Sequence, residues 1–184
     1  MLRRNFLLAL ATVVAAVFAF QSSAVADERM ELKNDAMKSL DKFFTDVHDG
    51  KDFLSKSKGY LVFPSVTSAG LVVGGEYGKG VLFIENKPVD FYSTKAASLG
   101  LTAGAQTKSM IIAFMTEEAL TKFQKSSGWE VGVDGSVAVA EIGADGSLNT
   151  TTTTNKSIVG FVFGQKGLMA DLSLEGSKIS KIEG

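Results

Sequence analysis

An apolar run near the C-terminus of the chain has a clear strand pattern. The run Ile158-Val159-Gly160-Phe161-Val162-Phe163 is rich in β-branched and aromatic residues and is too short for an ordinary helix. Turn residues bound it, so it predicts a strand that is buried on both faces and placed centrally in a sheet. Gly164 to Gly167 then predicts a turn, and the alternation from Leu168 to Leu174 predicts a second strand. Glu175-Gly176 predicts a further turn into a third antiparallel strand.

Three segments carry the spacing and the end signals of helices. Apolar residues recur every three or four positions from Met30 to Val47, which predicts an amphipathic helix. We favour packing of its apolar stripe on the sheet; the alternative is a membrane-surface helix, which the alternating Lys and Asp residues of its polar side weaken. Asp49 to Ser57 predicts a short second helix. A third should follow Thr116 as N-cap and end at Gly128.

Short alternating or apolar segments separated by turn residues predict the remaining strands. In chain order they are Gly59–Phe63, Ala69–Glu76, Gly80–Glu85, Val89–Tyr92, Ser98–Gln106, Met110–Met115 and Val131–Val139. Pro64 should end the first, because its nitrogen cannot donate to a ladder of hydrogen bonds. The segments 77–80, 86–88 and 144–147 predict turns, whereas 150–154 is either an edge strand or a loop.

These elements predict an α+β domain. It should contain a large antiparallel sheet, which either stays open or curls toward a barrel, with an N-terminal amphipathic helix and one or two further short helices. A chain of 184 residues suits one such domain better than two. Nineteen glycines beside two prolines indicate tight turns and kinked strands rather than a flexible linker.

The first 26 residues have the pattern of an export signal. Arg3-Arg4 is a basic start, residues 6–20 are apolar apart from Thr12, and Ala24-Val25-Ala26 is a small-residue cleavage site. We therefore expect cleavage after Ala26, a single domain over residues 27–184, and a periplasmic or secreted destination. The start also resembles a twin-arginine signal, so the export route stays open. The absence of cysteine excludes disulfides, although the expected destination is oxidising.

The charge and the inventory of side chains argue against several function classes. The formal charge is −1, and loss of Arg3 and Arg4 leaves 17 basic against 20 acidic residues, or −3, which argues against a nucleic-acid partner. With no cysteine and with His48 as the sole histidine, neither a nucleophile–base pair nor a metal site is recognisable. We therefore expect a non-enzymatic chain without a cofactor. Gly128, Trp129 and Asp134 are interpreted as structural residues.

Three segments in the same order resemble one known family. They are KGYLVFPSVTSAGLVVGGEYGKGVL from Lys58 to Leu82, KFQKSSGWEVGVDGSVAV from Lys122 to Val139, and FVFGQKGLMADLSLEG from Phe161 to Gly176. This pattern resembles the SYLF domain, a lipid-binding module, over most of the chain from about Leu32. The resemblance implies non-enzymatic binding of anionic phospholipid headgroups of the phosphoinositide type, or of a membrane surface.

Two further expectations follow from that resemblance. Eukaryotic relatives are associated with actin, but we do not expect actin as the partner of an exported chain. The alternative function is a structural or protein-interaction domain of the cell envelope without lipid affinity; protein partners are not predicted.

Four lysines are the candidate contacts for an anionic headgroup. Lys51, Lys56 and Lys58 stand close together beside the first matching segment, and Lys166 stands within the third. A single lysine is more often an ordinary solvated residue. Only a fold that brings several onto one face would create a lipid-binding surface.

Overall fold

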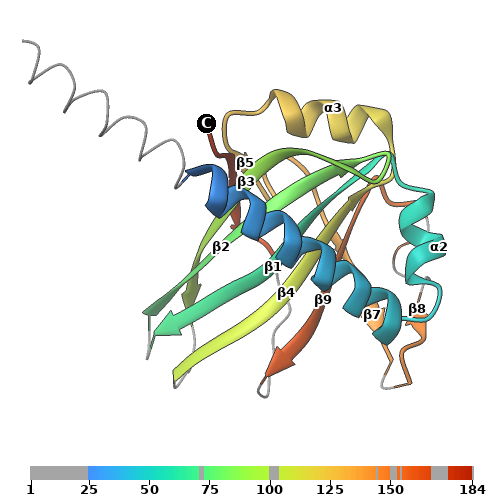
Figure 1. Cartoon of the computed structure of the whole chain (residues 1–184), viewed down its shortest axis with the longest axis horizontal. Coiled ribbons are helices and arrows are strands. Elements are labelled where there is room, and N and C mark those ends of the chain that lie inside the picture. Colours follow the sequence, from blue (N-terminus) through green and yellow to red (C-terminus); the bar gives the residue numbers. More distant parts are fainter. Residues whose placement is uncertain are drawn as a thin grey trace, which may run out of the picture.

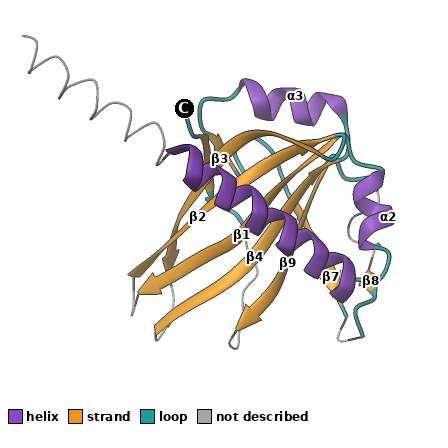
Figure 2. Cartoon of the chain, in the orientation of Figure 1, coloured by secondary structure: helices purple, strands orange, loops and turns teal. Residues whose placement is uncertain are grey.

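The computed structural model describes residues 25–70, 73–99, 104–143, 145–149, 153, 155–166 and 174–183. One curled sheet of eight strands, in the order β5-β10-β3-β2-β1-β4-β9-β6, forms the body of the described part (Figure 1). Neighbouring strands run antiparallel, except that β6 and β9 are parallel. Figure 2 shows one long helix crossing the sheet and two short helices beside it. The predicted α+β class, with a sheet that curls toward a barrel, is confirmed.

Four long strands form the middle of the sheet: β1 (Gly59–Gly70), β2 (Val73–Ile84), β3 (Lys87–Leu99) and β4 (Gly104–Phe114). The prediction that Pro64 ends the first of them is wrong. The register of β1 shifts around this residue against both of its neighbours. Such a bulge lets the strand continue past a residue that cannot donate to the ladder.

Other predicted boundaries are wrong as well, and at Gly80 the reason is packing between strands. The predicted turn at 77–80 lies inside β2, where a Cβ atom on Gly80 would approach Phe63 Cδ1 to 2.6 Å. The turn before β3 is instead Glu85 and Asn86, with φ angles of 51° and 61°. The predicted strand Ser98–Gln106 is divided between the end of β3 and the start of β4, which are not neighbours in the sheet.

The shorter strands come from the C-terminal part of the chain. They are β5 (Trp129–Glu130), β6 (Ala138–Val139), β7 (Glu141–Ile142), β8 (Leu148–Asn149), β9 (Ile158–Lys166) and β10 (Lys178–Lys181). The predicted continuous strand Val131–Val139 is wrong, since most of it connects β5 to β6 at opposite edges of the sheet. The predicted hairpin turn at 144–147 does connect β7 to β8, and Gly146 has a φ of 80° there.

β9 is buried on both faces, as predicted, but it is next to an edge strand rather than central. It extends to Lys166, so the predicted turn from Gly164 is wrong for its first three residues. The predicted strand Leu168–Leu174 lies outside the described residues, apart from its last residue. Most of the segment 150–154 lies outside them as well.

Among the described residues three segments are helical: residues 25–46, α2 (Gly50–Ser55) and α3 (Glu117–Lys125). Thr116 caps α3 as predicted, since its Oγ1 accepts from Ala119 N at 3.3 Å. Gly128 does not end this helix, because the C-cap is Ser126 in an extended conformation. Within the part of the chain that the structure describes, no helix has both the length and the hydropathy needed to cross a bilayer.

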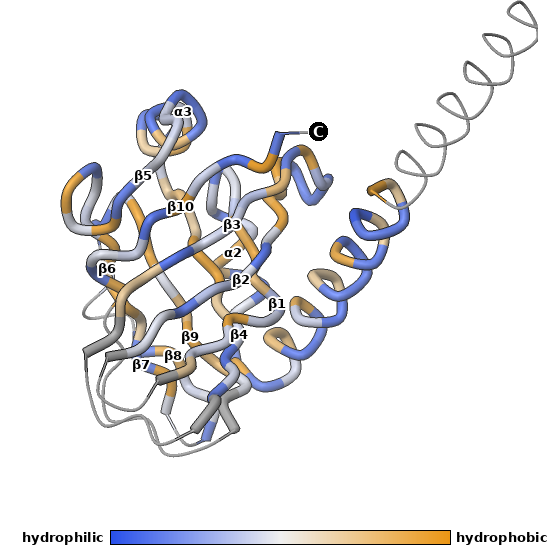
Figure 3. Tube along the Cα trace, turned by 90° about the vertical axis from the view of Figure 1, so that its left-hand side faces the viewer, coloured by the Kyte–Doolittle hydropathy of each residue, from blue (hydrophilic) through white to orange (hydrophobic). Residues whose placement is uncertain are grey.

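The curled sheet separates two hydrophobic clusters. The inner cluster includes Leu61, Ile112 and Trp129 and is closed off by α3. The outer cluster lies between the sheet and the helix over residues 25–46, whose buried positions are Ala36, Leu40, Phe43 and Val47. Figure 3 shows this helix on one side of the molecule, and β5 and β6, the two edge strands of the curled sheet, on the opposite side. The favoured prediction, that the helix packs its apolar stripe on the sheet, is therefore confirmed.

Candidate functional site

A groove of about 380 Å³ lies between the N-terminal helix, α2 and the turn from β2 to β3. We call it the apolar groove, because hydrophobic side chains make most of its lining. Its members are Met37, Leu40, Asp41, Phe44, Lys51, Leu54, Ser55, Tyr60, Phe83, Asn86 and Pro88. Lys51 and Asp41 are its charged members. The groove thus joins an apolar interior to an exposed cation from the predicted set.

The floor of the apolar groove is held by aromatic stacking and one hydrogen bond. The rings of Tyr60 and Phe83 stack with their centroids 5.5 Å apart and their planes 15° apart. The Tyr60 hydroxyl donates to Asn86 Oδ1 at 2.9 Å, and burial raises the pKa of Tyr60. Asn86 has a φ of 61°, a conformation that asparagine tolerates better than most residues. The floor is therefore set before any ligand arrives.

Exposed hydrophobic side chains flank the apolar groove. Met37 is 55% exposed, and Val89, which follows Pro88, is 45% exposed. Met30 is 62% exposed and stands seven residues before Met37, so both lie on the same side of the helix. Apolar side chains beside a lysine, at the edge of a groove, are typical of surfaces that contact a membrane or a partner protein.

The structure brings three of the four predicted lysines near one another. Lys51 lines the apolar groove, and Lys56 pairs with Asp52 at 2.6 Å on the same short helix. Lys58 follows directly, and its backbone N–H donates to Phe114 O at 2.8 Å. All three side chains are exposed.

Lys166 lies elsewhere, at the far end of β9. Phe114, which accepts the bond from Lys58, pairs with Ile158 at the start of that strand. Lys166 follows eight residues later, which places it about 26 Å along the sheet. The four lysines therefore do not form a single patch.

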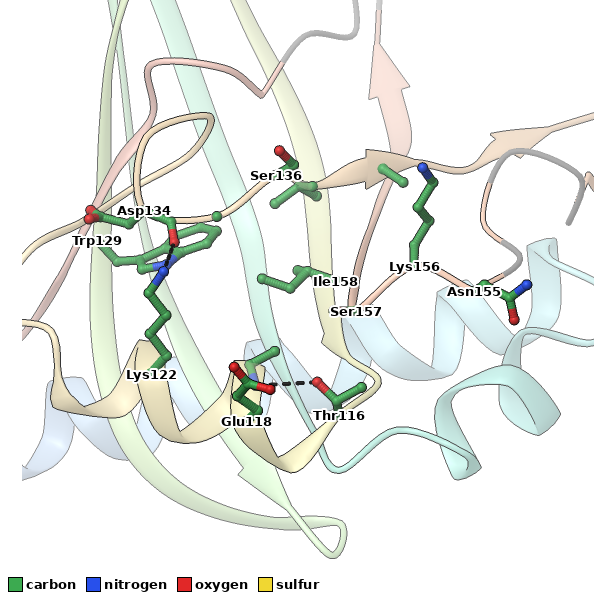
Figure 4. Close-up of a pocket in the computed structure, with 14 residues that line it drawn as sticks. Thr116, Glu118, Lys122, Trp129, Asp134, Ser136, Asn155, Lys156, Ser157 and Ile158 are labelled. Carbon is green, nitrogen blue, oxygen red and sulfur yellow. Dashed lines mark hydrogen bonds between the residues drawn. The ribbon is translucent and has the colours of Figure 1, made fainter.

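A second cavity, of about 540 Å³, lies where α3 meets the connection from β5 to β6. We call it the α3 pocket. It is lined by Thr116, Glu118, Ala119, Lys122, Trp129, Asp134, Gly135, Ser136, Val137, Ala138, Asn155, Lys156, Ser157 and Ile158. Lys122 and Lys156 stand on opposite sides of Ile158 (Figure 4). Polar and charged side chains make up a larger share of the lining in the α3 pocket than in the apolar groove.

The interpretation of Trp129 and Asp134 as structural residues agrees with their contacts. Asp134 Oδ2 accepts from Glu130 N at 2.7 Å, which closes the turn after β5. The backbone oxygen of Asp134 accepts from Lys122 Nζ at 2.7 Å. Trp129 is 1% exposed, and a Cβ atom on Gly135 would approach its Cζ2 to 2.8 Å. The indole and the carboxylate therefore fix the turn.

His48 lies in an exposed turn, and its backbone N–H donates to Gly146 O at 2.8 Å. Across the described ranges, no three His, Cys, Asp or Glu side chains are placed to hold a metal ion. Hydrogen bonds from Ser147 lower the pKa of the Asp145 carboxyl. These contacts stabilise turns.

A buried ion pair inside the curled sheet was missed by sequence reasoning. Lys108 Nζ lies 2.9 Å from Glu76 Oε2, and the lysine side chain is 4% exposed. Ser68 Oγ also donates to Glu76 Oε1, at 2.9 Å. The alternation of the strand could have revealed it, since Lys108 lies two residues before Met110 and four before Ile112, whose side chains both face the inner cluster.

Residues 95–183 match a family model described as "Ysc84: Las17-binding protein actin regulator", the model of the SYLF domain. The predicted SYLF resemblance is confirmed. The matched part of the chain includes Lys166 and every residue that lines the α3 pocket, whereas the apolar groove and Lys51, Lys56 and Lys58 precede it. No curated protein matches the chain.

Proposed function

We propose that this chain binds the surface of anionic phospholipid membranes through the apolar groove and the exposed lysines Lys51 and Lys58, and catalyses no reaction. The observation that carries the proposal is that Lys51 and the exposed Met37 both line the apolar groove. The SYLF family match supports lipid binding as the kind of function. Phosphoinositides are the headgroups we propose first, because the resemblance implies them.

The two parts of this surface would act on different parts of the lipid. Each lysine near an anionic membrane contributes about 1 kcal/mol, and this attraction fades within a Debye length of about 8 Å at physiological salt. Exposed apolar side chains gain about 25 cal/mol for each Å² that leaves water for the acyl region. Lys51 and Lys58 would thus bring the surface to the headgroups, and Met37 would insert beside them.

A protein partner is the second candidate function. The family description names a Las17-binding protein and an actin regulator, which favours protein binding for relatives of this chain. An apolar side chain of a partner would fill the apolar groove as well as an acyl chain does. Membrane binding should depend on the lipid composition of the vesicles, whereas binding to a protein partner should not.

Vesicle co-sedimentation of the chain from Asp27 onward tests the proposal. Phosphatidylcholine vesicles would be compared with the same vesicles containing phosphatidylserine or a phosphoinositide. We expect binding only to the anionic vesicles, and its loss in the double variant Lys51→Glu/Lys58→Glu. Lys125→Glu, at an exposed position on α3, is the matched control and should bind normally. Absence of binding by the unchanged chain would leave protein interaction as the better function.

We also propose export of this chain, with cleavage after Ala26. The support is the sequence pattern of residues 1–26. Intact-mass measurement on protein recovered from the expressing cells should give a chain that begins at Asp27. A full-length mass would contradict the proposal and would leave the lipid proposal untouched.

A further inference from the structure

Val133 is the most exposed of the large hydrophobic residues that the structure describes, at 76%. It lies in the turn between β5 and β6, directly before Asp134. Gly132, on its other side, has a φ of 92°. An exposed valine in a mobile loop needs no explanation, whereas one held in a fixed turn presents a constant apolar surface.

Backbone hydrogen bonds fix the turn from both ends. Gly132 N donates to Gly135 O at 2.9 Å, and Asp134 N donates to Glu130 O at 2.9 Å. Val131 exchanges two bonds with the segment before β10: its N–H donates to Ser177 O, and its oxygen accepts from Gly176 N, both at 3.0 Å. The Asp134 carboxylate and Lys122 brace it from inside the α3 pocket. Val133 is therefore presented in a set position.

The α3 pocket beside this turn offers two cations and an apolar floor. Lys156 is exposed and forms none of the ion pairs found among the described residues. Lys122 donates one hydrogen bond to Asp134 O and keeps further N–H donors, because an ammonium has three. Ile158 lies between the two lysines, and the Trp129 ring lies beside the Lys122 amine (Figure 4); both apolar side chains are buried.

We propose that the α3 pocket and Val133 together dock an extended protein segment that carries an acidic side chain beside an apolar one. The acidic side chain enters between Lys122 and Lys156, and the apolar side chain covers Val133. Ser136 lines the pocket and is exposed, and it offers its hydroxyl to the backbone of the docked segment. The fixed apolar side chain and the two lysines together offer such a segment one apolar and one electrostatic contact.

The charges of the pocket favour a peptide over a small polyanion. Glu118 also lines the pocket and would repel a phosphate carrying about two negative charges. Asp134 contributes a second carboxylate at the pocket, engaged by Glu130 N. A single carboxylate can lie against the lysines and away from Glu118, whereas a phosphorylated small molecule would leave Val133 uncovered.

Peptide display on the chain from Asp27 onward tests this proposal. Linear peptides of random sequence would be selected on the unchanged chain and counter-selected on the double variant Val133→Ser/Lys156→Glu. Synthetic copies of the enriched peptides would then be measured by fluorescence anisotropy. We expect Asp or Glu next to an aliphatic or aromatic residue in these peptides. Each single variant, Val133→Ser or Lys156→Glu, should weaken binding about tenfold or more.

Two exposed residues outside the site supply matched controls. Val89→Ser and Lys125→Glu change the same residue types and should leave peptide affinity within about twofold. Failure to enrich peptides, enrichment of another composition, or equal affinity for the Val133→Ser variant would overturn the proposal. Displacement of the peptide by inorganic phosphate would show a phosphate site instead. Vesicle binding should not change in the double variant, so this test and the lipid test fail separately.

Discussion

Lys108 is the residue that departs furthest from the alternation of apolar and polar positions. It points into the curled sheet with the same parity as Met110, yet it carries a charge. A buried ammonium is tolerated only when it is paired, and Glu76 supplies the partner at 2.9 Å. Ser68 satisfies the same carboxylate from the strand between them. The pair therefore connects β2 and β4 across β1.

Removal of one member of this pair should cost far more than removal of both. Lys108→Met leaves Glu76 without its cation and should lower the free energy of unfolding by about 3–5 kcal/mol. The double variant Lys108→Met/Glu76→Leu should regain most of that loss, because no buried charge remains. Urea denaturation of the single and double variants measures the difference. Strictly additive losses would show that the two side chains act independently.

Tyr92 is a second residue whose burial has a measurable consequence. It is 2% exposed, and its hydroxyl has no hydrogen-bond partner among the described residues. Burial, and then the charge of Asp90, raises the pKa of Tyr92 from its ordinary 10.0 to about 12. The phenol therefore ionises in the unfolded chain at a lower pH than in the folded one.

The stability of the fold should fall between about pH 10 and pH 12 for this reason. Below pH 10 both states keep the proton, and the full stability is present. As the pH rises toward 12, ionisation favours the unfolded chain, with a total loss of about 2–3 kcal/mol. Tyr92→Phe should remove this part of the pH dependence. Tyr77→Phe, at a side chain that is 46% exposed, should keep it. The measurement is denaturation at several alkaline pH values.

At the scale of elements, β9 is the strand that anchors the helices. The Phe161 ring meets Phe43 at 5.1 Å and Phe53 at 5.2 Å between centroids. Phe43 belongs to the N-terminal helix and Phe53 to α2. Phe163, on the same face, meets Phe43 from a second side at 5.1 Å. Phe161 and Phe163 stand two residues apart in the strand, and the face that they share is the face that holds both helices.

Shortening either ring should loosen this anchor. Phe161→Ala or Phe163→Ala should lower the free energy of unfolding by about 3–5 kcal/mol, from lost transfer energy and the cavity left behind. Hydrogen exchange should also speed up in residues 36–47, which pack over the same cluster. Tyr77→Ala, on an exposed side chain, is the control and should change stability little. A loss under about 1 kcal/mol at Phe161 would contradict this role for β9.

Local signals predicted the helices and the buried core of the strands, whereas strand ends depended on tertiary structure. Thr116 was recognisable as a cap because its role involves residues three positions away. The continuation of β1 past Pro64 depends on registers with β2 and β4, which no local pattern records. Gly80 was interpreted as a turn residue, although its lack of a side chain leaves space for Phe63 on the neighbouring strand. The central position predicted for β9 failed for the same reason.

The candidate sites were predictable only in part. Lys51 was recognisable as a cation within a predicted short helix. The apolar groove that it lines is built from elements that meet only in the fold. Lys166 was grouped with it because a turn was predicted at Gly164, and the continued strand carries it away. Val133 was predicted to lie within a strand, so neither its exposure nor the α3 pocket was visible in the sequence.

At the scale of the whole molecule, ion pairs within the chain neutralise much of its basic charge. Lys38, Lys79 and Lys181 pair with acidic neighbours, as Lys56 does with Asp52. Lys51 forms none of the ion pairs found among the described residues. A chain with an expected charge of −3 after cleavage is repelled by an anionic membrane at long range. Attraction must therefore come from a local surface at short range.

Membrane binding should consequently depend on salt in two distinguishable ways. Added salt screens the attraction of the lysines near the surface, so binding to anionic vesicles should weaken as salt rises toward 1 M, where the Debye length is about 3 Å. The apolar contribution of Met37 does not depend on salt. Met37→Ser should therefore reduce binding at every salt concentration, whereas Lys51→Glu should reduce it chiefly at low salt. Vesicle co-sedimentation across a salt series separates the two effects. Equal salt dependence in the unchanged chain and in Lys51→Glu would show that the cation acts elsewhere on the molecule.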